Sequence, residues 1–169
     1  MCASANPIYV DVEPVEGAVA NYCFYNVLDH SATFGGEPLF GWCVWEKADL
    51  WIEAEHHCIW LDSMGRLKDI SPKPDGEKKI LFIPDPSAVF DPSKPSWRNN
   101  VREALCDGDE IQNFLQAKDR ITTFEIAHSR PNGRDRMMDI KGHWVDVYNQ
   151  LKFEEQSATL ALQNELRGK

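Results

Sequence analysis

The stretch WIEAEHHCIWLDSMGRLKDI, residues 51–70, determines how the first half of this chain is interpreted. Two runs rich in β-branched and aromatic residues flank a short polar segment that contains glycine, which is the pattern of two antiparallel strands joined by a tight turn. The favoured connection is a type I turn followed by Gly65 in the left-handed conformation, because glycine adopts positive φ without steric cost. This turn pairs Asp62 with Arg66.

Counting outward from that turn gives the expected register of the hairpin. Ile59 then pairs with Asp69, and because side chains alternate between the two faces of a strand, His57 and Asp69 share a face as diagonal neighbours. A two-residue turn at 64–65 would instead place Asp69 on the face of His56. The position of the glycine favours the first register, so His57 is the predicted partner of Asp69 and His56 is the reserve.

Upstream of the hairpin, Cys23 completes an ordered set with His57 and Asp69. It lies in the helical run NYCFYNV. A thiol needs a base to take its proton and a third group to hold that base, so this order predicts a nucleophile, a base and an orienting carboxylate. If Asn21 caps the helix, Cys23 lies in the first turn, where the macrodipole favours a thiolate. If the helix begins near Gly17, Cys23 lies deeper; a buried core cysteine is the competing interpretation.

The remaining elements are predicted from apolar periodicity and from turn residues. Helices are expected over residues 15–30, 96–118 and 143–169, strands over 7–14, 39–47, 80–85 and 120–129, a proline-rich connector over 85–96 and a turn over 131–136. This order predicts an α+β fold, with the N-terminal helix packed on an antiparallel sheet and a helical C-terminal half.

The same order gives the expected domain organisation. Residues 1–83 are predicted to form a catalytic-type α+β core. Residues 84–169 are predicted to form the connector and a helical extension, packed with the core into one compact domain.

Composition limits the partners of the chain. The formal net charge of −9 over 169 residues argues against broad binding to nucleic acids or anionic membranes. No stretch approaches the ~18 apolar residues of a membrane span, and the first residues lack a signal-peptide pattern, so a cytoplasmic location is expected. Five cysteines at irregular spacings do not form a disulfide framework and are expected to be thiols. No oligomeric state is predicted.

A zinc site is the alternative interpretation of the cysteines and histidines around the hairpin. The candidate ligands are Cys43, His56, His57 and Cys58. Zinc needs ligands that converge tetrahedrally, usually from CxxC or HxxxH spacings, and the chain contains no CxxC. The three consecutive residues also alternate across their strand, so at most two point one way. The favoured interpretation therefore has no metal and no cofactor.

Substrate contacts are expected from residues near the predicted triad. Glu55, with Glu53, falls on the face of the predicted base, where a carboxylate could bind an amine; pairing with Arg or Lys is the competing interpretation. Trp45 offers a flat apolar wall with a polar edge, and packing in the core is its competing interpretation. An oxyanion would be bound by the backbone N–H of Cys23, with Asn21 or Asn26 as a possible amide donor; capping or core hydrogen bonding is the competing interpretation of both asparagines.

The order of a helix cysteine, a strand histidine and an aspartate on the next strand resembles the transglutaminase-like branch of the papain-like cysteine enzymes. His57 is followed by the apolar run CIW, and Asp69 is followed by ISP. In that branch, the histidine begins an apolar run and the aspartate follows a short turn. The likeness covers residues 17–83 and extends to amidases that deamidate glutamine. Residues 41–72 also resemble a family of small uncharacterised bacterial proteins.

The resemblance implies a thiol-dependent amide hydrolase or acyl-transferase of the peptidase or glutamine-deamidase type. Cys23 would be the nucleophile, His57 the base and Asp69 the orienting carboxylate, and the substrate would be an amide in a peptide or protein. The alternative is a non-catalytic module on the same fold. Its cysteine would be buried and inert, and its acidic surface and long terminal helix would recruit a protein partner.

Overall fold

A computed structural model describes residues 6–94 and 96–168, and the chain divides into two compact units. The first unit contains the chain up to Trp45 together with Ala54–Asp91, and the second contains Glu46–Glu53 and the chain from Pro92 onward. The division falls inside the proline-rich connector expected over 85–96. That both parts form one compact domain stays a prediction. No helix of the described residues is long and apolar enough to cross a membrane.

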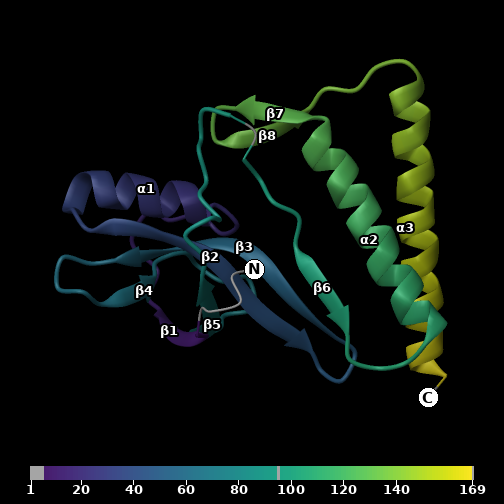
Figure 1. Ribbon diagram of the computed structural model, residues 1–169, viewed down its shortest axis with the longest axis horizontal. Helices are drawn as coiled ribbons and strands as arrows, with labels where there is room; N and C mark the ends of the chain where they lie inside the picture. Colours follow the sequence, from purple (N-terminus) through teal and green to yellow (C-terminus); the bar gives the residue numbers. More distant parts are fainter. Residues whose placement is uncertain (1–5, 95, 169) are drawn as a thin grey trace. The chain divides into compact units, whose positions relative to one another are not determined.

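The first unit is built on a closed sheet of five strands (Figure 1). The strands are β1 (Ile8–Val12), β2 (Glu37–Lys47), β3 (Trp51–Leu61), β4 (Leu67–Asp69) and β5 (Lys79–Pro84). They follow the order β2-β5-β1-β4-β3, and β3 pairs again with β2, which closes a barrel. The protein thus combines helices with a sheet-rich core.

The expectation of an antiparallel sheet is wrong at one pairing. Strands β1 and β4 run parallel, with Asp11 opposite Lys68 and Val12 opposite Asp69. Parallel neighbours need a long crossover connection, and here the connection is the whole segment that includes the first helix and the hairpin of β2 and β3. Strand β1 also pairs antiparallel with β5, so it lies between two strands that come much later in the sequence.

The hairpin of β3 and β4 has the predicted turn and register. The Asp62 N–H donates to the Arg66 carbonyl at 2.9 Å, and Gly65 has φ of 79°. The Asp62 carboxylate accepts N–H groups from Met64 and Arg66, which stabilises the turn. Trp60 lies opposite Lys68 and Leu61 opposite Leu67, so that Ile59 faces Asp69.

Alternating side chains of the strands fill the barrel. Its buried core consists of Val10, Val12, Cys43, Ile59, Ile80 and Phe82. The Phe82 ring is fully buried, and the glycine at position 41 of β2 leaves space for it. A Cβ atom at Gly41 would lie 2.7 Å from Phe82 Cζ and against the carbonyl oxygen of Ile83.

We therefore expect Gly41→Ala to lower the free energy of unfolding by about 1–3 kcal/mol, because overpacking forces the backbone and the ring to shift. Urea unfolding checks this. The control is Gly108→Ala, whose Cβ would meet its nearest neighbour at an ordinary 3.6 Å. An unfolding free energy of Gly41→Ala equal to that of the wild type would contradict the packing described for the barrel interior.

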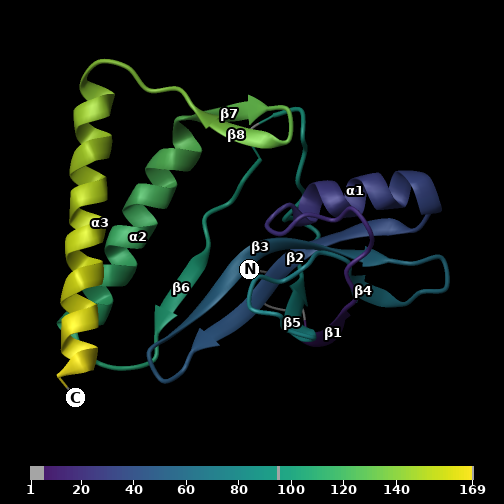
Figure 2. The same cartoon turned by 180° about the vertical axis from the view of Figure 1, so that it is seen from behind.

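Helix α1 (Cys23–Phe34) packs on the outside of the barrel (Figures 1 and 2). Val27 on its inner face is fully buried against Cys58 and Ile70, which point outward from β3 and the end of β4. The helix predicted over 15–30 therefore begins late, at Cys23. Residues 15–22 of the predicted range form turns instead.

The late start of α1 follows from the backbone before it. Asn21 has a positive φ of 67°, which no α-helix accommodates, and Tyr22 is the N-cap without a side-chain cap bond. Asn21 therefore does not cap the helix. Asn26 instead holds the preceding segment, because its amide bonds the N–H and the carbonyl of Val19 at 3.0 and 2.8 Å and Ser71 Oγ at 3.0 Å.

The second unit pairs two helices with short strands (Figure 2). Its elements are β6 (Val101–Ala104), α2 (Asp109–Ala127), β7 (Ser129–Asn132), β8 (Asp135–Met138) and α3 (His143–Arg167). Strand β6 pairs with β3, whose first three residues belong to this unit. Helices α2 and α3 lie side by side around a buried core of Ile111, Phe114, Leu115 and Leu162.

Two predictions for this unit are wrong. Residues 101–104 form a strand rather than part of a helix over 96–118, and residues 120–127 continue α2 rather than forming a strand over 120–129. Ile121 and Phe124 are both buried three residues apart, which is helical spacing, and the β-branched residues between them favoured the strand. The predicted terminal helix is confirmed as α3. The turn at 131–136 is confirmed within the β7–β8 hairpin, where Gly133 has a positive φ.

Candidate active site

His57 and Asp69 form a buried pair in the first unit. His57 Nε2 lies 2.8 Å from Asp69 Oδ2, and the two residues are 4% and 0% exposed. The register of β3 and β4 places them as diagonal neighbours on the face that lines the barrel. The other carboxylate oxygen, Oδ1, accepts the N–H of Ser71 at 3.0 Å, so both oxygens of Asp69 are engaged.

Cys23 is the first residue of α1 and lies close enough to the His57 imidazole for its side chain to raise the pKa of the ring. The start of a helix carries a partial positive charge and backbone N–H groups without intrahelical acceptors, which favours negative charge at this place. The structure thus brings together the three residues expected from the sequence.

The charges around His57 favour its protonated form. Burial alone would lower the pKa of His57, but the neighbouring Cys23 charge and the hydrogen bonds to Asp69 and Cys23 raise it from 6.5 to about 10. Burial would raise the pKa of Asp69, yet the bonds and charges of His57 and Lys73 hold it below its usual value. The geometry therefore suits an imidazolium beside the Asp69 carboxylate.

Lys73 is a member of this cluster that sequence reasoning missed. Its Nζ lies 2.7 Å from Asp69 Oδ2 and 3.3 Å from His57 Nε2. It lies in the segment after β4, where the sequence indicates only a polar turn with prolines. The spacing of four residues between Asp69 and Lys73 indicates a contact on a helix but carries no such meaning in a turn, so the sequence held no usable signal.

His56, the reserve candidate, points to the other side of β3. Its Nε2 lies 2.7 Å from the carbonyl oxygen of Ala88. Its ring packs against the rings of Phe24 and Trp42, with centroid distances of 4.7 and 5.6 Å. The alternation of side chains along the strand explains this separation from its neighbour. The structure places His57, and not His56, beside Asp69.

The other thiols of the first unit differ from Cys23 in their surroundings. Burial raises the pKa of Cys43 to about 12 and also raises that of Cys58. Cys43 lies in the barrel core, whereas Cys58 packs against α1 on the outside, so the ligands of the alternative zinc site do not converge. Among the described residues, no group of three or more His, Cys, Asp or Glu side chains could hold a metal ion.

The residues expected to contact a substrate lie at different places. Glu55 is exposed on β3, two residues before His57, and its charge acts on Cys43. Asn21 is exposed just before α1. Trp45 lies on β2 and is 39% exposed.

Glu53, expected on the face of His57, has a structural role in the second unit. Its carboxylate lies 2.8 Å from Arg102 Nη2, and it also accepts from Asn100. Arg102 in turn pairs with Asp119 at 2.6 Å. Since both Glu53 and the Arg102 side chain are buried, these bonds satisfy charges that would otherwise be costly.

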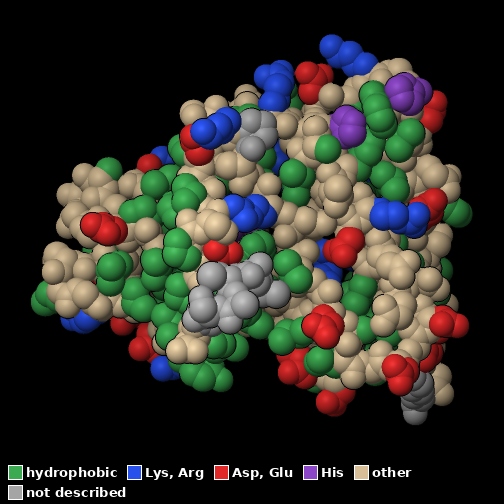
Figure 3. All heavy atoms as spheres, viewed as in Figure 1, with side chains coloured by type: hydrophobic (Ala, Val, Ile, Leu, Met, Phe, Trp, Pro, Cys, Tyr) green, Lys and Arg blue, Asp and Glu red, His purple; other side chains and the backbone are tan. Residues whose placement is uncertain are grey.

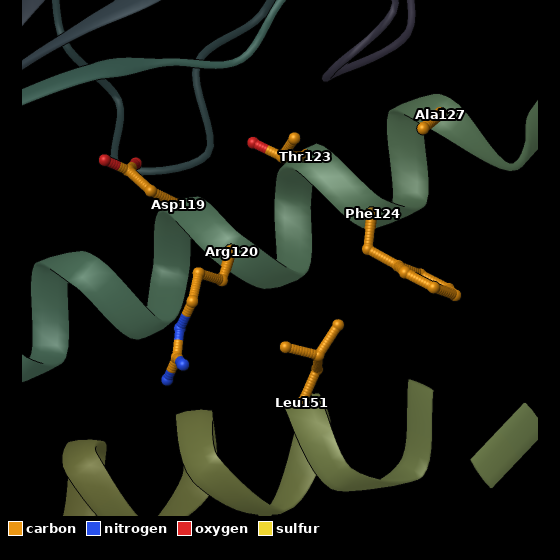
Figure 4. Close-up of a pocket in the computed structure, with 6 residues that line it drawn as sticks. All are labelled: Asp119, Arg120, Thr123, Phe124, Ala127 and Leu151. Carbon is orange, nitrogen blue, oxygen red and sulfur yellow. The ribbon is translucent and has the colours of Figure 1, made fainter. Parts of the chain in front are cut away.

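A shallow groove of about 420 Å³ lies between α2 and α3 (Figure 4). Its lining residues are Asp119, Arg120, Thr123, Phe124, Ala127 and Leu151. The two charged residues are already paired, Asp119 with Arg102 and Arg120 with Glu154, both at 2.6 Å. The groove therefore offers a mainly apolar surface and no convergent polar groups for a small ligand.

The histidines of the second unit pack against aromatic rings. His128 stacks on Phe124 with ring centroids 4.0 Å apart, and both His128 and His143 contact Trp144. Figure 3 shows histidines and hydrophobic side chains together at the end of the unit where α3 begins. These contacts are those of ordinary packing.

Comparison of the chain with protein-family models, with curated proteins and with solved structures gives no match.

Proposed function

We propose that this protein is a thiol-dependent amide hydrolase or acyl-transferase that uses Cys23, His57 and Asp69. The observation that carries the proposal is the placement of Cys23, the first residue of α1, near an imidazole that is bonded to a buried carboxylate. This is the arrangement that activates a thiol, with the carboxylate fixing the orientation and tautomer of the base. The resemblance to transglutaminase-like and papain-like enzymes implies the same chemistry and a related core.

In the proposed reaction, the Cys23 thiolate attacks the carbonyl carbon of an amide. The C=O electron pair moves onto the oxygen, which the backbone N–H of Cys23 can stabilise as one donor of an oxyanion hole. The C–N bond then breaks as the His57 imidazolium gives its proton to the leaving amine. A thioester on Cys23 remains. Water, deprotonated by His57, resolves it in hydrolysis, and an amine resolves it in transfer.

The proposed substrate is an amide in a peptide or in a glutamine side chain. Glu55 supports a substrate with positive charge, because its exposed carboxylate lies on the strand of His57 and the described residues include no ion-pair partner for it. Asn21 and Trp45 are proposed contacts at the edges of such a substrate. Free thiols at Cys23, Cys43, Cys58 and Cys106 suit a reducing, cytoplasmic location.

A non-catalytic binding module is the second candidate. The observation that favours it is the outer surface of α3, where Phe153 and Leu160 are 65% and 57% exposed and lie seven residues apart, on one face of the helix. In that case the Cys23 thiol, which is 8% exposed, would be inert.

Acylation by p-nitrophenyl acetate distinguishes the two candidates. The hydrolase is expected to release a burst of p-nitrophenolate of about one equivalent and to gain one acetyl group on Cys23, read by mass spectrometry of the peptide, because the reagent forms the same thioester as an amide substrate. Cys23→Ala should abolish the burst. Cys106→Ser, which removes a partly exposed thiol of the second unit, should leave it unchanged. No acetyl group on Cys23 would contradict the proposal.

A further inference from the structure

Lys73 occupies an unusual position for a lysine. Its side chain is only 15% exposed, although lysine is rarely buried unless it is paired. Its Nζ is 2.7 Å from Asp69 Oδ2, the same oxygen that lies 2.8 Å from His57 Nε2. One carboxylate oxygen is thus shared by two cationic partners, and the two nitrogens are 3.3 Å apart.

This sharing affects the imidazole in two ways. The ammonium neutralises part of the negative charge that Asp69 presents to His57, and it also places a second positive charge beside the ring. Both effects disfavour the protonated ring. The carboxylate, in contrast, keeps its charge more firmly because it has two partners, which agrees with the lowered pKa of Asp69.

We propose that Lys73 is a positioning residue that divides the Asp69 carboxylate between itself and His57, and so loosens the hold of the imidazolium on its proton. The inference rests on the proposed function, in which His57 must give that proton to a leaving amine. An imidazolium that holds its proton too tightly is a poor acid near neutral pH. Lys73 would then bring the strongly paired imidazole back toward the range in which it can act as an acid.

The other side chains that act on His57 have the opposite effect. Cys23 from α1 raises the pKa of the ring, as do the bond and the charge of Asp69 from β4. Lys73 is therefore the cation of this cluster among the described residues, and its removal leaves only groups that favour a charged ring.

The test is a titration of the imidazole itself. In protein labelled with ¹⁵N-histidine, the His57 ring signals are identified by their loss in His57→Ala and followed from about pH 6 to about pH 12. We expect the titration midpoint of Lys73→Met to lie about one pH unit above that of the wild type, because a like charge and a competing partner have both been removed. Lys73→Arg, which keeps the charge and a donor, should titrate near the wild type. A lysine that only supports the fold would not shift the midpoint in this direction.

The outcomes separate the inference from the proposed function. If Cys23→Ala lowers the His57 midpoint but Lys73→Met leaves it unchanged or lowers it, the inference is overturned while the thiol–imidazole pair stands. If Cys23→Ala leaves the midpoint where it was, the proposed pair fails. Should Lys73→Met not fold, Lys73→Gln, which keeps a donor to Asp69 without the charge, carries the same expectation. Failure of both to fold overturns the inference.

Discussion

Replacing His57 with alanine is expected to slow alkylation of Cys23 by iodoacetamide about 30-fold at pH 7, because a thiol without an imidazolium partner is only a few per cent thiolate at that pH. The rate is measured by mass spectrometry of the Cys23 peptide after quenching at a series of times. The physical reason is the contact between the first residue of α1 and the His57 ring.

The matched control for this prediction is His56→Gln. His56 is the neighbouring buried histidine, and its Nε2 faces the Ala88 carbonyl and not Asp69. This variant should lose some stability and keep the alkylation rate of Cys23. A rate that falls equally in both variants would show that general loosening of β3, and not the imidazole, controls the thiol. A rate that is unchanged in His57→Ala would contradict the proposed nucleophile.

Replacing Asp69 with alanine is expected to lower the free energy of unfolding by about 3–5 kcal/mol, because it leaves the buried cations of His57 and Lys73 without their shared partner. Asp69 is fully buried, and bonds to His57 and Lys73 meet on its Oδ2. Urea unfolding at neutral pH measures the loss. The control is Asp11→Ala on the same barrel, whose exposed pair with Lys79 at 2.8 Å should contribute at most about 1 kcal/mol. Equal losses in the two variants would contradict the buried pair.

The stabilisation that this pair gives the folded protein is lost at both low and high pH. Folding lowers the pKa of Asp69 from its ordinary value of 3.8. The stabilisation by this carboxylate is therefore present above pH 3.8 and is lost as the pH falls through the lower pKa of the folded protein. The pKa of His57 is raised, so its contribution is present below 6.5 and is lost as the pH rises through about 10. The stability difference between the wild type and Asp69→Ala should therefore be largest between pH 3.8 and 6.5. A difference that grows steadily from pH 6.5 to 10 would contradict this account.

The part of the site that the sequence predicted is the part that depends on local chemistry. Gly65 and Asp62 encode the turn within a few residues, and the turn sets the register that brings His57 to Asp69. The sequence does not decide where α1 begins, because the start at Cys23 depends on the positive φ of Asn21 and on Asn26 reaching back to Val19, which no periodicity reveals.

Other features depend on contacts between residues distant in sequence. Strand β6 pairs with β3, and Arg102 on β6 meets Glu53 on β3. Residues 120–127 are helical, with Ile121 and Phe124 buried on one face of α2. The burial of these two side chains outweighs the intrinsic β propensity of residues 120–127. Lys73 reaches Asp69 through the conformation of a proline-containing turn, and side-chain type alone does not predict where such a turn directs a lysine.

The place of β1 between β4 and β5 has a consequence for how the molecule forms. The earliest described strand has both of its partners more than fifty residues later, so the barrel cannot close until the chain through Pro84 is available. Such distant pairings slow folding, because the entropy of closing the loop is lost before the contacts repay it. Asp69 lies opposite Val12 in this pairing. During synthesis on a ribosome, Asp69 would therefore reach its place beside Val12 only after most of the first unit has emerged.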